Sequence, residues 1–404
     1  MTLSEMKQYR KTYHDELFNS FIPFWTNNAI DPVHGGVYTC LDRTGKMYST
    51  DKSGWFQGRC AWTYAHLCNV YGHRDEWLQI AKNCLDFSEK HLIDADGRMF
   101  FAVTEAGRPL RKRRYMATEA FYVLGNAEYA IATGDTAARD NAKKYFRFMT
   151  DMYDDAAADP FKIHPKVYPE TRPMRGLGSP MILIDLCDTM RRADPENAMW
   201  YGKRSAGFVD DIMRYHYKED IEALLENVGP NGEFLWECSA GRHINPGHDL
   251  EACWFMLREA IRVGNDTLIQ AAKKIYDWSM RRGWDTEYGG LLYFVDAFRY
   301  PPEPYEHDMK LWWPQNEAII ASLMLYQHTK DECYAKDFKR IHDYTFSHFP
   351  DREYGEWYGY LRRDGKPTEP APKGTMYKGP FHIARMLMQV EGIFAEMEKT
   401  IESN

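Results

Sequence analysis

The segment NPGHDLEACWF, residues 245–255, places titratable side chains directly beside large apolar ones. If the segment is helical, His248 and Glu251 are three residues apart and share a face. Trp254 and Phe255 continue along much the same side, which predicts that the polar pair points toward an interior. Such a pair is either a core histidine held by a carboxylate or part of a site for proton transfer.

A second histidine stands in similar surroundings. His248 follows a loop ending in NPG, His382 follows KGPF, and each histidine opens an apolar segment. Imidazole titrates near neutral pH, so two such groups beside carboxylates suit acid–base chemistry. The sequence has no G-x-S-x-G elbow, no P-loop and no Rossmann glycine fingerprint. Nucleophilic catalysis and recognisable nucleotide chemistry therefore have little support.

A metal site is an alternative use of the same segment, with His243, His248 and Glu251 as ligands. Two histidines with four residues between them do not have a usual zinc spacing. We therefore expect no metal ion at this position.

The elements that must position these residues recur along the chain. Six helix-like apolar segments are alike: GWFQGRCAW, RYMATEAFYVL, GSPMILIDL, GHDLEACWF, WWPQNEAIIASLML and KGPFHIARMLM. One residue from each segment serves to measure the repeat: Arg59, Glu119, Met181, Glu251, Glu317 and His382. Successive markers are 60, 62, 70, 66 and 65 residues apart. More amphipathic segments such as DTLIQAAKKIYDWSMRRG pair with them, and turn-rich stretches such as DTEYGGLLYFVD indicate small hairpins between pairs.

Six helix pairs predict two concentric rings, with apolar helices inside and amphipathic helices covering them. Repeated helix pairs could instead build an open solenoid. The hairpin connections, and polar residues on otherwise apolar helices, favour closure around a central cleft. We predict an all-α fold, an (α/α)6 barrel of six helix pairs with short β-hairpin connections, in a single catalytic domain spanning residues 1–404.

Composition excludes several classes of protein. The chain is 44% hydrophobic and 27% charged, as expected of a soluble globular protein. Its net charge of −8 argues against nucleic-acid binding. The sequence contains no run of about 18 apolar residues, so it predicts no membrane span. The eight cysteines form no CxxC pairs, and the charged N-terminus is unlike a signal peptide. We expect a cytoplasmic protein with reduced thiols.

In a closed barrel, polar residues of the inner segments would converge near the mouth of the cleft. Uncompensated buried charge is costly, so these groups must pair with one another or meet a ligand. A purely structural ion-pair network, such as Arg59 with Glu317, is the alternative to an active site. The residues concerned are Arg59, Glu119, His248, Glu251, Glu317 and His382.

Four motifs, DKSGWFQGRCAWTYAHL, NPGHDLEACWF, WWPQNEA and KGPFHIARML, resemble the N-acylglucosamine 2-epimerase family in order and spacing over essentially the whole chain. The resemblance implies an (α/α)6 barrel and a homodimer, with ATP as an allosteric effector, although no nucleotide-binding loop is recognisable. The family's essential arginine falls on Arg59, its catalytic histidines fall on His248 and His382, and its active-site glutamates fall on Glu251 and Glu317.

The resemblance implies interconversion of N-acetylglucosamine and N-acetylmannosamine. In the open-chain sugar the C2 proton is alpha to a carbonyl, so one histidine would remove it and the other would return a proton to the opposite face. We expect Glu251 to orient His248, Arg59 to stabilise the oxyanion, and Trp313 and Tyr115 to contact the sugar ring. This chemistry requires no metal and no redox cofactor.

Relatives on the same fold leave the sugar open. Cellobiose 2-epimerases and aldose–ketose isomerases of mannose tend to carry a further histidine on the third inner helix. This chain has Ser179, Pro180 and Met181 there, which favours an N-acyl amino sugar. The GHD of GHDLE, however, also occurs in disaccharide epimerases.

Two other classes of function are weaker alternatives. A glycoside hydrolase needs two carboxylates flanking the scissile bond, and Glu251 and Glu317 could serve, but both histidines would then lack a role. A protein-binding role would favour a leucine heptad, and none persists from Leu183.

Overall fold

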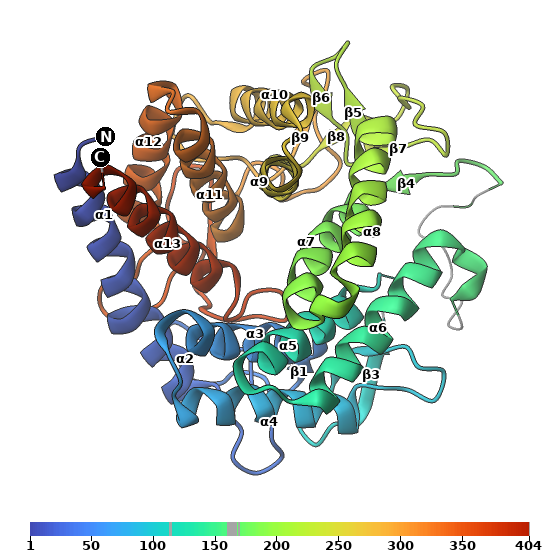
Figure 1. Ribbon diagram of the computed structural model, residues 1–404, viewed down its shortest axis with the longest axis vertical. Helices are drawn as coiled ribbons and strands as arrows, with labels where there is room; N and C mark the ends of the chain where they lie inside the picture. The colour runs from blue at the N-terminus through green and yellow to red at the C-terminus, as the bar shows by residue number, and fades with distance from the viewer. Residues whose placement is uncertain (113–114, 160–167, 169, 404) are drawn as a thin grey trace.

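Helices of an outer and an inner ring alternate along the chain in the computed structural model, which describes residues 1–404 except 113–114, 160–167, 169 and 404 (Figure 1). The inner helices are α3 (Gly54–Tyr71), α5 (Ala117–Thr133), α7 (Gly178–Ala193), α9 (Pro246–Val263), α11 (Trp312–Thr329) and α13 (His382–Glu402). The outer helices are α1 (Leu3–Glu16), α2 (Ile22–Asn28), α4 (Asp75–His91), α6 (Thr136–Asp154), α8 (Ala198–Asp211), α10 (Asp266–Gly283) and α12 (Glu332–His348).

Burial separates the two rings as the hydrophobic pattern predicts. Helix α11 buries apolar Ile319 together with polar Glu317, whereas α10 buries Ile275 and Tyr276 and exposes Lys274. Each inner helix contacts the next one, and α13 also contacts α3, so the inner ring is closed. The predicted (α/α)6 barrel is confirmed, and the open solenoid is excluded.

The sixth helix pair joins the two ends of the chain. The repeat predicts that each inner segment precedes its outer partner, but α13 is the last helix, and α1 packs against it instead. Lys7 Nζ lies 2.7 Å from Glu402 Oε1, and Arg10 Nε lies 3.1 Å from Glu398 Oε1. Helix α1 and the C-terminal part of α13 accordingly lie side by side (Figure 1). The first helix therefore covers the last inner helix and completes the outer ring.

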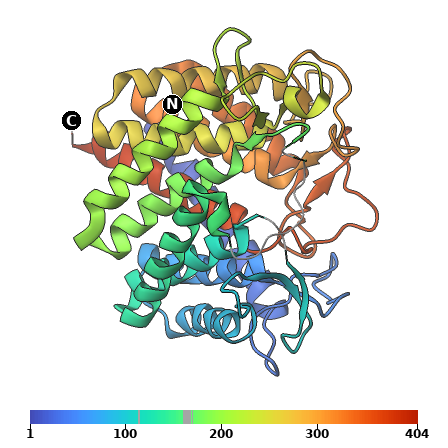
Figure 2. The same cartoon turned by 90° about the vertical axis from the view of Figure 1, so that its right-hand side faces the viewer.

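Short antiparallel strands precede the inner helices and gather with the loops at one end of the barrel (Figure 2). Strands β1 (Lys52–Ser53), β2 (Phe100–Val103) and β3 (Pro109–Lys112) form one sheet. The two-stranded pairs are β4 (Arg175–Gly176) with β7 (Asn227–Val228), β5 (Tyr217–Lys218) with β6 (Ala223–Leu224), β8 (His243–Ile244) with β9 (Val295–Asp296), and β10 (Lys310–Leu311) with β11 (Tyr360–Leu361). Only β2–β3 and β5–β6 are hairpins between neighbouring strands; the other pairs link different connections of the described chain.

Buried lysine–aspartate pairs hold two of these connections in place. Lys52 Nζ donates to Asp31 Oδ2 at 2.6 Å, and Lys310 Nζ donates to Asp285 Oδ2 at 3.0 Å. Both lysine side chains are fully buried. Each lysine precedes an inner helix and its aspartate begins a glycine-rich turn, so the ion pair ties the turn to the start of the helix.

A glutamine five residues after each lysine repeats this connection. Gln57 accepts from Val37 N at 2.9 Å and donates to Val37 O at 2.9 Å. Gln315 makes the same two bonds to Leu291, at 2.9 and 3.0 Å. The amide side chain satisfies both backbone groups of one loop residue, as a neighbouring strand would. The starts of α3 and α11 are therefore fixed by equivalent contacts.

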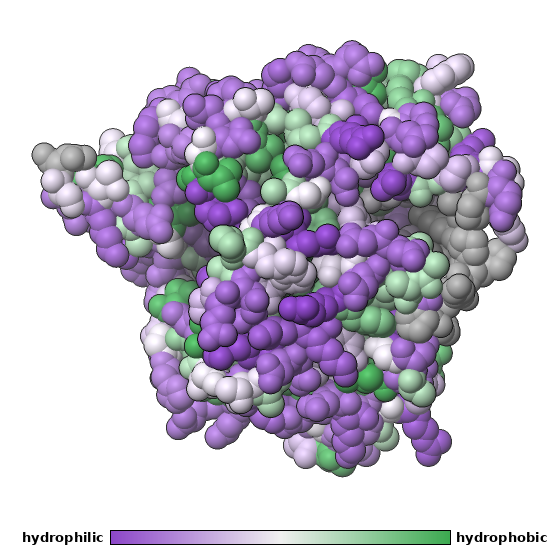
Figure 3. All heavy atoms as spheres, turned by 45° about the vertical axis from the view of Figure 1, so that its right-hand side comes forward, coloured by the Kyte–Doolittle hydropathy of each residue, from purple (hydrophilic) through white to green (hydrophobic). Residues whose placement is uncertain are grey.

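Hydrophilic side chains predominate on the face in Figure 3, with hydrophobic ones scattered among them. Among the described residues, no helix combines the length and apolar character needed to cross a lipid bilayer.

Breaking one of the buried ion pairs should destabilise the fold strongly. Lys52→Met leaves the Asp31 carboxylate buried without its cation, so the free energy of unfolding should fall by about 3–5 kcal/mol. The control Lys11→Met removes the exposed Lys11–Asp15 pair of α1 and should cost at most about 1 kcal/mol. Equilibrium urea denaturation measures both, and equal losses would contradict a special role for the buried pair.

Candidate active site

Side chains from three consecutive inner helices meet where those helices begin. His248 lies in the first turn of α9, Trp313 and Glu317 lie in the first two turns of α11, and His382 is the first residue of α13. The centroid of the Trp313 ring lies 5.2 Å from that of His248 and 5.7 Å from that of His382. A Cβ atom at Gly247 would lie 2.5 Å from the Trp313 ring, so glycine is needed for this approach. The two imidazoles therefore flank Trp313.

His382 is buried between a carboxylate and two guanidinium groups. Its Nδ1 lies 2.8 Å from Glu317 Oε1, and Arg59 Nη2 lies 3.4 Å from its Nε2. Burial, reinforced by the cations of Arg59 and Arg385, holds the pKa of His382 well below its usual value. The neutral ring donates from Nδ1 to Glu317, which leaves the lone pair of Nε2 on the side of Arg59.

His248 has a different partner and a different charge. Pro246 opens α9 and the Asn245 side chain caps it, accepting from His248 N at 3.3 Å. His248 Nδ1 lies 2.8 Å from Glu226 Oε2. Burial alone would lower the pKa of His248, but the Glu226 carboxylate, assisted by Glu251, raises it to about 9. The imidazole is therefore protonated at neutral pH.

Arg385, one turn after His382 on α13, lies between the two site glutamates. Its Nη2 donates to Glu251 Oε1, and to Glu317 Oε1 at 2.8 Å. Trp254 Nε1 donates to the other oxygen of Glu317 at 2.8 Å. Burial raises the pKa of Glu317, and the Arg385 cation opposes that effect. One buried cation thus serves two buried carboxylates.

The prediction that Glu251 orients His248 is wrong in this structure. The Glu251 carboxylate pairs with Arg385, and Glu226 holds His248 Nδ1. The reason is electrostatic, because Arg385 is buried and would be costly to leave without carboxylate partners. Glu251 remains close enough to assist in raising the pKa of His248.

Arg59 has no carboxylate partner among the described residues, so the structural alternative of an Arg59–Glu317 ion pair is excluded. Its guanidinium carbon lies 3.9 Å from the ring centroid of Phe121 and 5.0 Å from that of Phe381. Burial lowers the pKa of Arg59 to about 9, although the Glu251 carboxylate acts against this shift. A buried guanidinium surrounded by aromatic rings and next to His382 Nε2 is suited to receive an anionic oxygen.

Two further predicted residues lie elsewhere. Glu119 does not join the cluster: Arg98 Nε donates to its Oε1 at 2.7 Å, and Met99 N donates to the same oxygen at 2.8 Å. Glu119 therefore anchors the segment before β2. Tyr115 lies in the connection between β3 and α5 with 47% of its surface exposed, and its contact with a sugar stays a prediction.

The structure does not bring together the alternative metal ligands His243, His248 and Glu251. Among the described residues, the potential ligand atoms that come together, within 4.8 Å, belong to Glu251, Glu317 and His382 rather than to a set with His243 and His248. Arg385 Nη2 already contacts both carboxylates and lies 3.4 Å from His382 Nδ1. This donor set therefore fits an internal guanidinium better than a metal ion.

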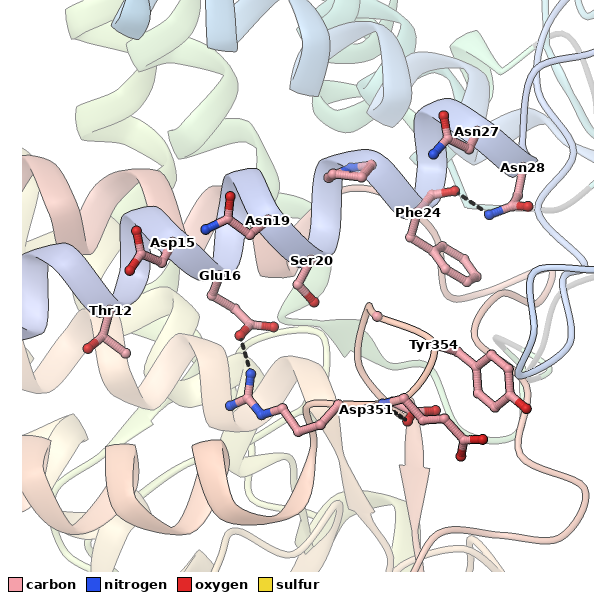
Figure 4. Close-up of a pocket in the computed structure, with 14 residues that line it drawn as sticks. Thr12, Asp15, Glu16, Asn19, Ser20, Phe24, Asn27, Asn28, Asp351 and Tyr354 are labelled. Atoms are coloured by element: carbon pink, nitrogen blue, oxygen red, sulfur yellow. Dashed lines mark hydrogen bonds and ion pairs between the residues drawn. The ribbon is translucent and has the colours of Figure 1, made fainter.

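A groove of about 660 Å³ lies away from these residues. It runs between the α1–α2 segment and residues 351–355, where Arg352 Nη1 donates to Glu16 Oε2 at 2.7 Å (Figure 4). None of the predicted site residues lines it. The groove is bordered by polar side chains, and it contains neither of the two site histidines nor Arg59.

Glu226 and Arg385 are the site residues that the sequence analysis missed. Arg385 follows His382 by three residues and so shares its helical face, which was a usable signal. Glu226 lies on the β6–β7 connection, 22 residues from His248, and no periodic pattern marks it.

Known proteins resemble this chain over most of its length. The sequence model of the N-acylglucosamine 2-epimerase (GlcNAc 2-epimerase) family matches residues 36–383. The chain is 36% identical over 375 residues to the N-acylglucosamine 2-epimerase of Bos taurus, covering 92% of this chain and 87% of that protein. It is 25% identical over 412 residues to the cellobiose 2-epimerase of Ruminococcus albus, covering 96% and 98%.

The fold has a close match among solved structures. The cellobiose 2-epimerase from Spirochaeta thermophila DSM 6192 aligns with a TM-score of 0.84 at 22% sequence identity, covering 98% of each chain. Together with the family match over most of the sequence, these likenesses show that the chain belongs to the N-acylglucosamine 2-epimerase family, whose members are isomerases.

Proposed function

We propose that this protein is a sugar 2-epimerase that interconverts N-acetylglucosamine and N-acetylmannosamine. The observation that carries the proposal is the pair of imidazoles flanking Trp313, with the guanidinium of Arg59 beside one of them. The likeness to a bovine protein named N-acylglucosamine 2-epimerase supports the choice of sugar.

The reaction needs two groups that exchange protons with C2. In the open-chain sugar, one imidazole removes the C2 proton, and the electron pair of the C–H bond moves to the carbonyl oxygen. The other imidazole then donates its proton to the opposite face of C2, and the carbonyl reforms. His382 and His248 come from α13 and α9, on either side of α11, which supports their action on opposite faces.

The remaining charged groups suit supporting roles. Arg59 would stabilise the negative oxygen of the enolate, because its guanidinium has no carboxylate partner among the described residues. Glu317 would hold the tautomer of His382 through Nδ1, and Arg385 would hold Glu317 and Glu251. Trp313 would contact the sugar between the histidines.

The alternative sugars and reactions have less support. Cellobiose and mannose remain the alternatives on this fold, since cellobiose 2-epimerases are also relatives. A glycoside hydrolase is disfavoured because its two candidate carboxylates, Glu251 and Glu317, are both bound to the buried Arg385.

The wider setting of the enzyme is part of the same proposal. We place it in the cytosol, where its eight free cysteines would stay reduced. We propose one catalytic domain over residues 1–404, a homodimer, no nucleic-acid partner, no metal or redox cofactor, and ATP as an allosteric effector.

Incubation of the sugars in deuterated water tests the reaction. N-acetylmannosamine should convert to N-acetylglucosamine without added metal or nicotinamide, with deuterium at C2, because the returned proton comes from solvent-exchanged imidazole. NMR reports both the product and the label, with mannose and cellobiose as parallel substrates. Turnover of mannose to fructose without turnover of the amino sugar would refute the proposal.

Replacing either histidine should abolish most epimerisation. His248→Asn and His382→Asn should each lower the rate by about 10²–10⁴-fold, because each removes a general acid or base. Each variant should still exchange the C2 proton of one epimer, and the two variants should favour opposite epimers. The control His14→Asn alters a histidine that pairs with Glu391 on the surface of α13 and should be neutral.

Circular dichroism and thermal melting must accompany these rates. Wild-type rates in both folded variants, or unfolding of both, would return His248 and His382 to the role of core histidines.

Arg59→Lys tests the oxyanion role. A point ammonium cannot copy a planar guanidinium, so activity should fall by roughly 10²-fold or more while the melting temperature changes little. The control Arg74→Lys alters an exposed arginine that lies over Trp77 in the same kind of aromatic contact and should keep full activity. Steady-state kinetics of both variants measure the effect. Near-normal turnover by Arg59→Lys would show that Arg59 does not stabilise the oxyanion.

A further inference from the structure

Glu226 is built into the framework of the barrel rather than into a free loop. It lies between β6 and β7, where its backbone N donates to His243 O at 3.0 Å and its backbone O accepts from Leu177 N at 2.9 Å. These two bonds tie it to the residue just before α7 and to the strand β8 that leads into α9. The backbone position of Glu226 is therefore set independently of His248.

The Glu226 carboxylate contacts one of the two ring nitrogens of His248, Nδ1. Glu226 Oε2 lies 2.8 Å from His248 Nδ1, and only 19% of the glutamate side chain is exposed. The protonated imidazole carries hydrogen on both ring nitrogens. A proton at Nδ1 is thus held by Glu226, and the proton at Nε2 remains available.

Other charged groups around this pair do not replace Glu226. The titratable neighbours of His248 and Glu226 are Asp249, Glu251, His216, His243 and His382. Glu251 has Arg385 as its own counter-ion. Asp249 accepts from Ser279 Oγ at 2.6 Å, and burial raises its pKa well above the usual value, which disfavours its charged form. The histidines add no negative charge.

We propose that Glu226 is the positioning residue that keeps His248 protonated, so that the free enzyme rests with its two histidines in opposite protonation states. The proposal rests on the epimerase function proposed above. In this state His382 is the base and His248 is the acid before any sugar arrives.

The proton balance of one turnover follows from that resting state. The C2–H bond breaks toward His382 Nε2, its electron pair moves to the carbonyl oxygen, and the Nε2 proton of His248 forms the new C2–H bond. The enzyme then holds a protonated His382 and a neutral His248. It returns to rest when His382 loses its proton to solvent and His248 regains one.

The test is Glu226→Gln, which keeps an acceptor for Nδ1 but removes the charge. Burial then dominates, so the pKa of His248 should fall from about 9 to its ordinary value or lower. The alkaline limb of the kcat/KM profile should move down with it. At pH 8, a shift from 9 to 6.5 reduces the protonated fraction, and hence kcat/KM, by roughly 30-fold.

Two variants serve as controls. Glu226→Asp keeps the charge and should retain most of the alkaline limb, which a merely structural role would not predict. Glu391→Gln removes the carboxylate from the surface pair with His14 and should leave the pH profile unchanged.

NMR titration of labelled histidine side chains makes the test independent of activity, with the His248 signal assigned by its loss in His248→Asn. A wild-type midpoint near 9 that falls in Glu226→Gln supports the proposal, even if no sugar is epimerised and the proposed function fails. A wild-type midpoint near 6.5, or an unchanged midpoint in Glu226→Gln, overturns it. If Glu226→Gln does not fold, the His248 midpoints of the wild-type protein and of Glu226→Asp test the proposal. Midpoints near 9 support it, and midpoints near 6.5 overturn it.

Discussion

The buried guanidinium of Arg385 is the interaction on which the rest of the site depends. It neutralises Glu251 and Glu317, two carboxylates that the inner helices α9 and α11 bring into the interior. Without it, both acids would be buried without a cation, a state that costs several kcal/mol. Glu317 in turn contacts His382 Nδ1, so Arg385 acts on the tautomer of His382 by holding the Glu317 carboxylate in place. The contacts that compensate these buried charges therefore also orient His382 for its proposed role.

Electrostatic asymmetry distinguishes the two histidines. Burial and the cations of Arg59 and Arg385 keep the His382 imidazole neutral although it contacts Glu317, whereas the Glu226 carboxylate overcomes the effect of burial at His248. Identical side chains at the starts of two equivalent helices thus acquire different protonation states. The buried ion pairs of Lys52 and Lys310 fix the starts of α3 and α11, the helices that place Arg59 and Glu317 beside His382.

Much of the architecture was predictable because it repeats. Six apolar segments at nearly equal spacing identify six inner helices, and amphipathic partners identify the outer ring. The same alignment of segments predicted that His248, Glu317 and His382 would meet, since each opens an inner helix at the same end of the barrel. The pairing of α1 with α13 and the strand pairs between different connections were not predictable, because they join residues far apart in the chain.

The sequence by itself determined the helix pairs, the closed barrel and the identity of most side chains at the site. Periodicity and motif spacing are local properties, and they carry over into structure directly. Only the tertiary structure decided which charge meets which. It assigned Glu251 to Arg385 rather than to His248, gave His248 to Glu226, and left Arg59 among aromatic rings. Such partners are chosen by the cost of burying each charge in the assembled interior, and that cost exists only once distant segments have packed together.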